Sequence, residues 1–457
     1  MTPAGEPARA PARHPLPRWR TLSVALGALL LAACSSPSPG LAAAPATMAA
    51  PGASMRADSS HYIVLAVDNP LENPGGRAGS TMGGYGAPPR YMLGSRAEAT
   101  LAAIAKEHGL HEAAGWPIAT LGWHCVVFEL PPSRSREDVL AALQHDPRVR
   151  LAQPLQDFDT RSAPQLPAPS VAASAADAGL LYNDPYVNLQ RGFVDTAAAR
   201  AHRVSTGAGV RVAVVDTGAA LDHPDLVGRV ALARNLVDDS SAAGFEPDRH
   251  GTEVAGVIAA VGNNHEGIVG IAPQARLIIL RACWPREGAA GDAARCNSFT
   301  LAKALAAVLE SDARVVNLSL GGPSDPLLDK LLAELLRQGR IVIGALPPDG
   351  RRGGFPTGLP GVIAAGVSGE IEAAAGKEVI AAPGRDVLTL QPGGRYDYAS
   401  GSSIAAAHVS GVAALMLSAQ PRLDRAALTE MLLTGGAGRS PLNAGNALEA
   451  LATGKLR

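Results

Sequence analysis

The chain is short of aromatic residues, of charge and of cysteine. Aromatic side chains make up 4% of its 457 residues and charged ones 18%, there are 4 cysteines, and the formal net charge at pH 7 is -1. A chain without excess positive charge lacks the basic surface that binds phosphate backbones, so nucleic acid is not an expected partner. Glycine and proline are plentiful, at 50 and 36 residues. Together with abundant alanine they favour closely packed small-residue helices joined by many turns.

Long apolar runs are scarce as well. The run Leu22–Ala33 follows Arg18 and Arg20, and it is too short for a comfortable transmembrane helix. A basic start followed by such a run predicts a signal peptide over residues 1–33. No later stretch is long and apolar enough to suggest a membrane span.

The leader ends in Leu-Ala-Ala-Cys34, which resembles the lipoprotein box of bacterial exported proteins. The resemblance implies cleavage before Cys34 and attachment of a lipid to its sulfur. Ser35 follows instead of an aspartate, which in that family points to the outer membrane. We therefore expect an exported protein, anchored by lipid to the outer membrane and facing the periplasm or the surface. An ordinary secretory signal with a chance cysteine is the alternative.

A small α+β unit is predicted after a tether. Residues 34–58 are rich in Ser, Pro and Ala, which is typical of a disordered tether. In residues 59–160, strand patterns alternate with helical patterns, and this order suggests a ferredoxin-like sandwich. The strand patterns cover 61–67, 121–130 and 149–153, and the helical ones lie around Leu101–Ala105 and Val139–Leu143. The Pro/Ala/Ser-rich residues 161–182 predict a linker.

Residues 183–457 alternate between strand and helix over their whole length. Buried-strand runs cover 210–215, 277–280, 315–318, 341–343 and 362–365, and helical patterns cover 253–261, 299–311 and 327–338, with further helices from Ile404 and Arg425. This alternation predicts an α/β fold with a doubly wound, mostly parallel sheet. In such sheets, functional sites form beyond the carboxyl ends of the strands.

Three polar residues lie where that rule places a site. Asp216 ends a strand, His250 opens a helix, and Ser403 opens the last apolar helix. A helix start offers unpaired N–H groups and a positive dipole end, which favour a developing anion at Ser403. Each residue alone has a plain role as a cap or a turn residue. Together they supply an orienting carboxylate, a general base and a nucleophile.

The segments around these residues carry a family resemblance. Val-Val-Asp216-Thr-Gly, His250-Gly-Thr-x-Val-Ala-Gly and Gly-x-Ser403-x-Ala-Ala-x-His-Val resemble the three signatures of the subtilisin-like serine endopeptidases, the subtilases or peptidase family S8. The order Asp, His, Ser matches that family and not the α/β-hydrolases. The resemblance implies a subtilisin-like catalytic domain over residues 183–457, with Asp216, His250 and Ser403 as its catalytic triad.

The resemblance also implies partners. The segment Asn317–Gly322 resembles the family's substrate-binding edge strand, whose backbone pairs with an extended peptide; the residues concerned are Ser319, Leu320, Gly321 and Gly322. Residues 59–160 look like the family's inhibitory propeptide, a prodomain of the inhibitor I9 type. The implied partners are a peptide or protein substrate and the protein's own propeptide, with processing of the zymogen expected within about 155–185.

One position departs from the family pattern. Pro348 falls where relatives carry the asparagine whose amide stabilises the oxyanion, and Pro347 precedes it. Proline has neither a side-chain donor nor an N–H group. The remaining expected oxyanion donors are the backbone N–H of Ser403 and the hydroxyl of Ser402. Losing one such donor lowers turnover by about 10²–10³-fold, a figure obtained within this family.

Two structural features follow from the resemblance and the residues. Asp184, Asp225 and Asn264 sit where relatives bind calcium, and oxygen ligands of this kind suit that ion. No cofactor is required for the chemistry, and a metal-free turn is the equal alternative to a structural calcium site. Cys283 and Cys296 bracket a Gly/Ala-rich loop; in an exported protein they would form a disulfide worth about 3 kcal/mol, or else remain two free thiols.

The sequence thus predicts an exported serine endopeptidase that is made as a precursor and acts through an acyl-enzyme on Ser403. A catalytically weak or inactive relative that binds peptides is the alternative, favoured by Pro348 and opposed by the complete triad. An esterase is a third interpretation, which turnover of small esters without peptide cleavage would support.

Overall fold

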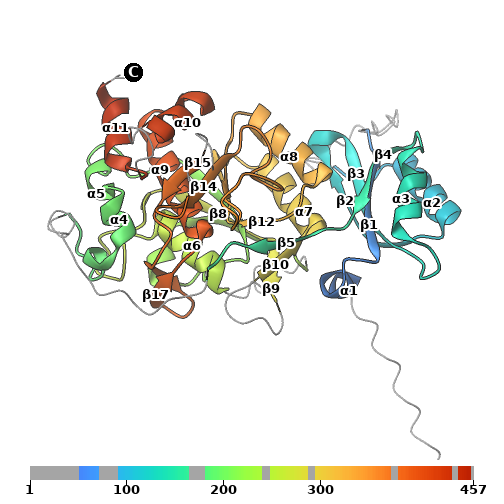
Figure 1. Ribbon diagram of the computed structural model, residues 1–457, viewed down its shortest axis with the longest axis horizontal. Helices are drawn as coiled ribbons and strands as arrows, with labels where there is room; N and C mark the ends of the chain where they lie inside the picture. Colours follow the sequence, from blue (N-terminus) through green and yellow to red (C-terminus); the bar gives the residue numbers. More distant parts are fainter. Residues whose placement is uncertain are drawn as a thin grey trace, which may run out of the picture. The chain divides into compact units, whose positions relative to one another are not determined.

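The computed structural model describes residues 51–70, 91–163, 181–238, 248–286, 294–371, 379–434 and 441–453. Residues Ala49–Arg457 form one compact unit (Figure 1), and residues 1–48 lie outside the described residues. The predicted signal peptide, the lipidation site Cys34 and most of the predicted tether therefore also lie outside them.

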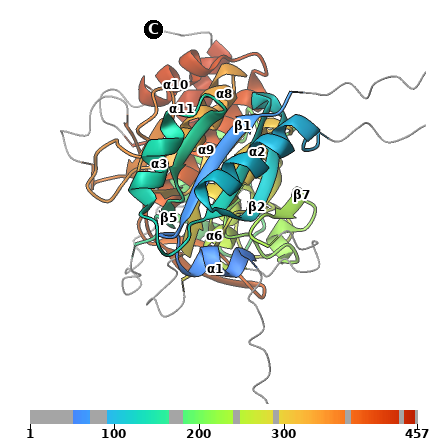
Figure 2. The same ribbon diagram turned by 90° about the vertical axis from the view of Figure 1, so that its right-hand side faces the viewer.

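Residues 51–154, here named the N-terminal sandwich, form an antiparallel sheet covered by two helices. The sheet has the order β2-β3-β1-β4, and two helices lie over one face (Figure 2). The elements in chain order are β1 (Tyr62–Asp68), α2 (Ser95–His108), β2 (His111–Ile118), β3 (Trp123–Glu129), α3 (Arg136–Gln144) and β4 (Val149–Pro154). Ser135 caps α3 by accepting a hydrogen bond from the Asp138 N–H. This order of elements is that of a ferredoxin-like sandwich.

Strand β2 was not expected from the sequence. It contains Gly115 and Pro117, and its large apolar side chains are confined to Trp116 and Ile118, so its apolar alternation is too short to predict a strand. Glycine weakens a strand, and proline cannot donate to a ladder; both are tolerated at the edge of a sheet. β2 is such an edge, paired only with β3 in its sheet, and its register with β3 is set by tertiary packing.

A seven-stranded parallel sheet forms the centre of residues 181–453, with the order β15-β14-β13-β11-β6-β8-β7. Its strands are β6 (Arg211–Asp216), β7 (Val230–Asn235), β8 (Arg276–Arg281), β11 (Val315–Leu318), β13 (Ile341–Ala345), β14 (Ile363–Val367) and β15 (Val379–Ala382). β6, which comes first along the chain among these seven strands, lies inside the sheet, so the later strands are added on both sides of it. The predicted doubly wound α/β fold is confirmed.

Helices cover both faces of this sheet. On β6, Val212 and Val214 face a core shared with α6 (Arg249–Ala259) and α9 (Ser402–Ala419). The alternate residues Ala213 and Val215 face a second core, shared with α7 (Ser298–Leu309) and α8 (Pro326–Arg337). Successive side chains of a strand point to opposite faces, so the unbroken apolar run of β6 is explained by burial on both sides.

The remaining elements are short or peripheral. They are α4 (Arg191–Asp195), α5 (Ala198–Ala201), α10 (Arg425–Thr434), α11 (Ala444–Thr453) and the hairpin β16 (Val387–Gln391) and β17 (Arg395–Ala399). By length and composition α9 could cross a membrane, contrary to the sequence expectation that no segment after the leader could. It is instead the mostly buried central helix of the first core.

The N-terminal sandwich packs its open sheet face against α7 and α8 (Figure 1). The indole of Trp116 contacts the Phe299 ring edge-on, with centroids 4.8 Å apart. Gln153 and Asp325 are both buried; the Gln153 amide donates to the Asp325 carboxylate at 2.7 Å and accepts from the Leu327 N–H at 3.0 Å. A buried amide with both ends satisfied ties the sandwich to the start of α8.

The two segments flanking the sandwich differ from expectation. Residues 51–57 form helix α1 (Pro51–Ala57), where a disordered tether was expected to continue to 58, because Met55 is buried in the core shared with α7 and α8. Residues 155–163, here named the tail, run extended into the main sheet region instead of beginning a linker at 161. The tail includes β5 (Asp157–Thr160), which joins a second sheet of order β12-β5-β10-β9. Its other strands are β9 (Cys283–Pro285), β10 (Ala294–Asn297) and β12 (Leu320–Gly321).

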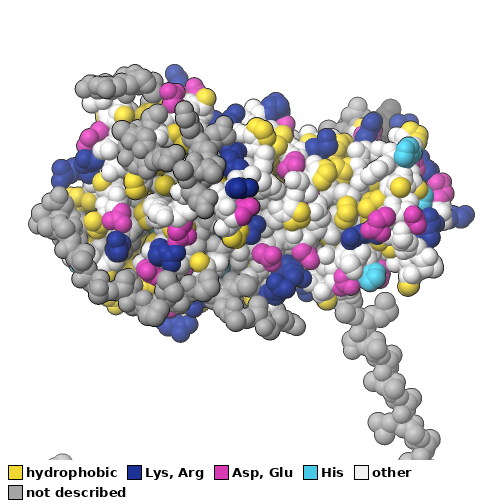
Figure 3. Space-filling view, in the orientation of Figure 1, with side chains coloured by type: hydrophobic (Ala, Val, Ile, Leu, Met, Phe, Trp, Pro, Cys, Tyr) yellow, Lys and Arg dark blue, Asp and Glu magenta, His cyan; other side chains and the backbone are white. Residues whose placement is uncertain are grey.

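The surface carries charges of both signs. On the face shown in Figure 3, Lys and Arg side chains are interspersed with Asp and Glu side chains over the described surface. This mixed pattern agrees with the formal net charge of -1 and gives no support to nucleic-acid binding on that face.

Candidate active site

Asp216 and His250 are in direct contact at the carboxyl end of the central strand. Asp216 ends β6 and His250 lies in the first turn of α6. Nδ1 of His250 donates to Oδ1 of Asp216 at 2.6 Å. Both side chains are buried, at 0% and 1% exposure. A carboxylate at Nδ1 fixes the ring so that Nε2 is the free nitrogen, as a general base requires.

The backbone around this pair holds α6 against the end of β6. Oδ1 of Asp216 also accepts from the Thr217 N–H at 2.7 Å, and the Thr217 hydroxyl accepts from the Gly251 N–H at 3.0 Å. A Cβ on Gly251 would lie 1.7 Å from the carbonyl oxygen of Gly218. Only glycine permits this approach, so the His-Gly pair at the start of α6 is what brings His250 to Asp216.

The charge of Asp216 changes the basicity of His250. Burial by itself lowers the pKa of His250, but the charge of Asp216 and its hydrogen bond outweigh burial and raise the pKa to about 9. Glu253 and Asp248 add smaller contributions in the same direction. Nε2 of His250 is buried without a hydrogen-bond partner among the described residues. The site thus favours the protonated imidazole, the form that an acyl-transfer step generates.

Ser403 lies in the first turn of α9, and its hydroxyl does not cap the helix. The N-cap is Gly401, with φ 142° and no side-chain bond, and Oγ of Ser403 is buried without a partner in the described structure. The plain interpretation of Ser403 as an N-cap is therefore wrong. Helices α6 and α9 pack against each other and against β6. This packing brings the helix starts that carry His250 and Ser403 to the same end of the sheet.

The predicted substrate edge is occupied by the tail. Leu320 and Gly321 pair antiparallel with Thr160 and Asp159, and the Ser319 carbonyl accepts from the Arg161 N–H at 3.1 Å. Gly322 departs from the expectation: its N–H and carbonyl pair with Phe355 instead of the peptide. The sequence prediction stopped the α+β unit at 160 and missed Arg161.

Ser402 does not serve as the expected second oxyanion donor. Its hydroxyl donates to the Leu346 carbonyl at 2.7 Å, and one hydroxyl proton cannot serve two acceptors. The backbone N–H of Ser403 donates to the Arg161 carbonyl at 3.3 Å. Pro347 and Pro348 follow Leu346 and line, with Arg161 and Ser402, a cavity of about 390 Å³. Pro348, the position of the expected family asparagine, thus borders open space.

Restoring that amide is expected to raise turnover. We predict that Pro347→Gly combined with Pro348→Asn increases kcat about 10-fold or more and changes KM little, because the missing donor acts mainly in the transition state. The cavity gives the new side chain room. Steady-state kinetics on a peptide substrate measure the effect, with Pro347→Gly alone as the control. No gain in the double variant, with wild-type turnover already high, would show that another group completes the oxyanion site.

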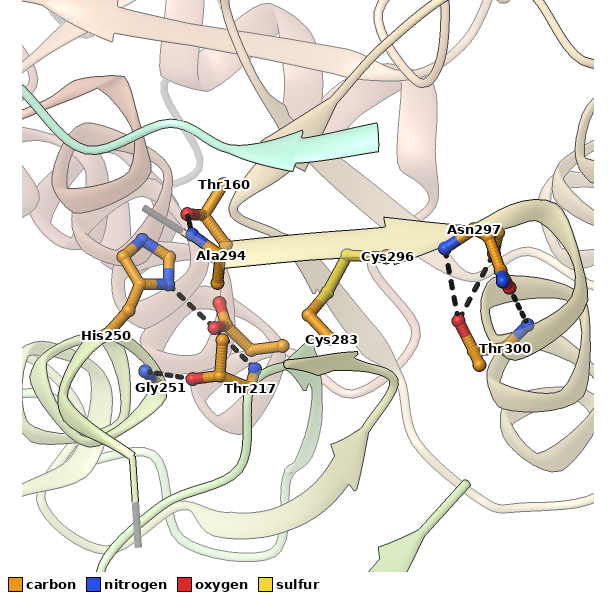
Figure 4. The surroundings of a disulfide bond; sticks show 10 residues. Thr160, Thr217, His250, Gly251, Cys283, Ala294, Cys296, Asn297 and Thr300 are labelled. Carbon is orange, nitrogen blue, oxygen red and sulfur yellow. Dashed lines mark hydrogen bonds and ion pairs between the residues drawn. A yellow bond between two sulfur atoms is a disulfide. The ribbon is translucent and has the colours of Figure 1, made fainter. Parts of the chain in front are cut away.

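The structure joins Cys283 and Cys296 in a disulfide, with Cα atoms 4.3 Å apart. These residues lie on β9 and β10 and face each other across the antiparallel pair (Figure 4). The bond fixes the strand that pairs with the other side of the tail. Cys125 is the remaining cysteine of the described residues and is buried in the sandwich, where burial raises the pKa of its thiol and keeps it protonated.

Asp184, Asp225 and Asn264 meet in one place. Nδ2 of Asn264 lies 2.8 Å from Oδ1 of Asp225, and the Asn263 N–H donates to Oδ2 of Asp184 at 2.8 Å. Oδ1 of Asp184 is buried without a partner in the described structure. Burial raises the pKa of Asp184 and of Asp225, and the charge of Asp225 raises that of Asp184 further. The oxygens of two buried carboxylates and of the Asn264 amide, whose Oδ1 accepts from the Glu266 N–H at 3.1 Å, are donors of the kind that suits calcium.

Known proteins share this architecture. The family model described as the subtilase family, Peptidase_S8, matches residues 207–444, which is just over half of the chain. The thermophilic serine proteinase of Bacillus sp. (strain AK1) is 33% identical over 295 residues, covering 62% of this chain and 66% of that protein. Thermitase of Thermoactinomyces vulgaris is 33% identical over 248 residues, covering 52% of this chain and 85% of that protein. Subtilisin E of Bacillus subtilis (strain 168) is 31% identical over 240 residues, covering 50% and 60%.

A solved structure extends the likeness to most of the chain. Fervidolysin from Fervidobacterium pennivorans, a keratinolytic enzyme related to subtilisin, superposes with a TM-score of 0.63 at 20% identity, covering 85% of this chain and 61% of that one. At this identity the match shows the fold alone. This chain spans 60–66% of the length of subtilisin E and the AK1 proteinase.

The parallel sheet, the Asp-His pair at its carboxyl end and the serine at a helix start define a class, that of the serine-type endopeptidases. The chain belongs to the subtilase family, peptidase S8.

Proposed function

We propose that the protein is an active serine endopeptidase, made as an exported precursor, in which Asp216, His250 and Ser403 form the catalytic triad. The observation that carries the proposal is the environment of Ser403. Its N–H binds a peptide carbonyl of the tail at 3.3 Å, while its Oγ and Nε2 of His250 are buried and unpaired among the described residues. A hydroxyl that neither caps the helix nor makes a hydrogen bond to a described residue, and that lies beside a bound peptide, is suited to act as a nucleophile.

In the proposed mechanism each residue has one task. Asp216 orients His250 and stabilises its protonated form through the 2.6 Å bond. His250 takes the proton of Ser403, and Oγ attacks the peptide carbonyl to give an acyl-enzyme. The N–H of Ser403 stabilises the oxyanion at the start of α9, where the helix dipole adds to its effect. His250 returns the proton to the leaving amine, and water then hydrolyses the ester.

The N-terminal sandwich is proposed to act as an inhibitory propeptide. Its tail fills the substrate edge, and the sandwich is held on α7 and α8 by the Trp116–Phe299 contact and by Gln153. These contacts lie away from Asp216, His250 and Ser403. The sandwich can therefore keep the tail in place without touching the catalytic groups, which makes the protein a zymogen until the tail leaves.

Casein hydrolysis by the purified protein tests the proposed function. We expect hydrolysis that Ser403→Ala removes. Tight peptide binding without hydrolysis would support the inactive, peptide-binding alternative, which Pro348 favours. Turnover of small esters without casein cleavage would support an esterase. Either result would refute the endopeptidase proposal.

Membrane attachment through Cys34 is proposed from the lipoprotein-like box at residues 31–34. Mass spectrometry of the membrane fraction is expected to show an N-terminal peptide that begins at Cys34 and carries a diacylglyceryl group. Cys34→Ser should move the protein from the membrane to the soluble fraction. A wild-type mature form that begins beyond Cys34 at a signal cleavage site would contradict lipid anchoring.

A structural calcium ion is proposed at Asp184, Asp225 and Asn264, where it would neutralise two buried carboxylates. Removal of calcium with EGTA is expected to lower the Tm by about 5 °C or more, the shift that about 2.7 kcal/mol of linked binding gives in a domain of this size. Calorimetry measures it. Asp184→Asn should lower the Tm and make it insensitive to EGTA. A wild-type Tm that EGTA leaves unchanged would refute the site and favour a metal-free turn.

A further inference from the structure

Asn317 places a polar side chain in a row of apolar ones. It lies on β11, in register with Val214 of β6 and Ile343 of β13, which face the core shared with α9. The side chain of Asn317 is fully buried. Burying an amide is unfavourable unless its donors and its acceptor find partners, so the partners of this amide indicate what it does there.

A chain of hydrogen bonds runs through the Asn317 amide from one point of α9 to another. The Ser410 hydroxyl donates to Oδ1 of Asn317 at 2.9 Å, and Nδ2 of Asn317 donates to the Ser319 hydroxyl oxygen at 2.8 Å. The Ser319 hydroxyl in turn donates to the Ser403 carbonyl at 3.0 Å. All four side chains are fully buried. Because the Ser319 oxygen accepts a proton from Asn317, its own single proton is directed to Ser403.

The Ser319 hydroxyl also closes a ring that includes the bound peptide. The Arg161 N–H of the tail donates to the Ser319 carbonyl at 3.1 Å, and the Ser403 N–H donates to the Arg161 carbonyl at 3.3 Å. The bond from the Ser319 hydroxyl to the Ser403 carbonyl is the third side of this ring. It fixes the N–H that binds the peptide carbonyl relative to the carbonyl that binds the peptide N–H. Since the peptide contributes backbone groups alone, the ring can form with any residue at this position.

We infer that Asn317 is a positioning residue for the acyl-transfer reaction, which holds the Ser403 N–H in place for the substrate carbonyl by directing the Ser319 hydroxyl to the Ser403 carbonyl. The inference rests on the proposed endopeptidase function. In the described structure the side-chain hydrogen bonds of Asn317 go to Ser319 and Ser410, so it acts on the peptide through Ser319.

The missing asparagine makes this position more important. With proline at 348 and the Ser402 hydroxyl bonded to the Leu346 carbonyl, the Ser403 N–H is the expected oxyanion donor that remains. Its bond to the peptide carbonyl is already long, at 3.3 Å, and a further displacement of about 0.5 Å would take it out of hydrogen-bonding range. Apolar packing holds α9 on the sheet, but the direction of a hydrogen bond at its first turn depends on polar contacts.

The first test is Asn317→Leu, which keeps the shape of the side chain and removes the amide. We expect kcat to fall about 10- to 100-fold and KM to change less than about 3-fold, because the Ser403 N–H acts mainly in the transition state. The pH at which activity rises should stay the same, because the bond between Asp216 and His250 is untouched. Steady-state kinetics on a peptide substrate across a pH series measure both effects, and calorimetry measures the change in Tm.

A double-mutant cycle shows whether Asn317 acts through Ser319. Ser319→Ala removes the hydroxyl with little change in volume and should lower kcat about as much as Asn317→Leu. The double variant should lose no more kcat than Ser319→Ala alone, because both changes break the same bond to the Ser403 carbonyl. Two unrelated losses would multiply instead. If Asn317→Leu fails to fold, Ser319→Ala decides the question, since its hydroxyl is the route by which Asn317 acts.

Thr389→Val is the matched control. The Thr389 hydroxyl is also fully buried and donates to a backbone carbonyl of the other catalytic helix, that of Glu253 on α6, at 2.7 Å. Removing it should lower the Tm, as the loss of any buried hydrogen bond does, and leave kcat within about 2-fold.

The outcomes separate this inference from the proposed function. An unchanged kcat in Ser319→Ala, kcat losses that multiply in the double variant, or an equal kcat loss in Thr389→Val would overturn the positioning role alone, provided that the wild-type protein hydrolyses casein. A wild-type protein that hydrolyses neither casein nor the peptide would overturn the proposed function and this inference with it.

Discussion

Ser403→Ala is expected to lower kcat/KM for a peptide substrate by about 10⁶-fold, the size of loss found when the nucleophile of a subtilisin is removed. The structure gives the reason. Oγ of Ser403 is buried and makes no hydrogen bond to a described residue, so the substitution removes little besides the nucleophile. Because no supporting bond is lost, the Tm should change little, and calorimetry separates loss of chemistry from loss of folding.

The neighbouring hydroxyl provides a matched control for Ser403. Ser402→Ala removes a hydroxyl from the same helical turn, and this hydroxyl is bonded to the Leu346 carbonyl. We expect Ser402→Ala to lower kcat/KM less than 10-fold, because the Ser402 hydroxyl holds the loop at Leu346 and makes no hydrogen bond to the Arg161 carbonyl. A loss of about 10²-fold or more in Ser402→Ala would show that its hydroxyl turns to the oxyanion during the reaction.

Asp216→Asn is expected to lower kcat by about 10⁴-fold and to shift the pH dependence of the remaining activity. His250 must lose its proton before it can act as a base, so activity rises as the pH increases through the pKa of His250. Asp216 raises that pKa to about 9 while the tail is bound. In the variant the charge is gone and burial lowers the pKa, so the acid limb should move to lower pH. The pH profiles of kcat/KM for both proteins measure this.

Asp248 is the corresponding control for charge. It caps α6 by accepting from the His250 N–H at 3.1 Å and contributes least among the charges acting on His250. Asparagine caps helices about as well as aspartate. Asp248→Asn should therefore leave kcat within 10-fold and move the acid limb only slightly. An acid limb that stays unchanged in Asp216→Asn would contradict the assignment of Asp216 as the partner that sets the basicity of His250.

The fold of the main sheet could be predicted because its central strands are buried on both faces. An unbroken apolar run of about four residues, such as 212–215, is typical of a strand covered on both sides. The strand predicted over 315–318 has the same bounds as β11 in the structure. The two strands of this sheet that the sequence did not predict, β7 and β15, lie at its edges. They have mixed or partial burial, so tertiary pairing and not local pattern defines them.

The site was predictable in its residue types but not in its contacts. The motifs around Asp216, His250 and Ser403 indicated the residue types of the site, because each motif has characteristic neighbours at a fixed spacing. The partner of the Ser402 hydroxyl depends on how the loop after β13 turns, and the sequence around Pro347 carries no signal for that. The role of Arg161 depends on the pairing of β5 with two strands more than 100 residues away, which no local pattern can reveal.

Covalent labelling with a fluorophosphonate probe, followed by mass-spectrometric mapping of the adduct, tests directly whether Ser403 is an activated nucleophile. Such probes react with a serine that a general base activates, and we expect one adduct, on the peptide that contains Ser403. Labelling should disappear in Ser403→Ala and fall strongly in Asp216→Asn. Labelling that survives the loss of Ser403, or processed wild-type protein that does not react at all, would refute Ser403 as the nucleophile.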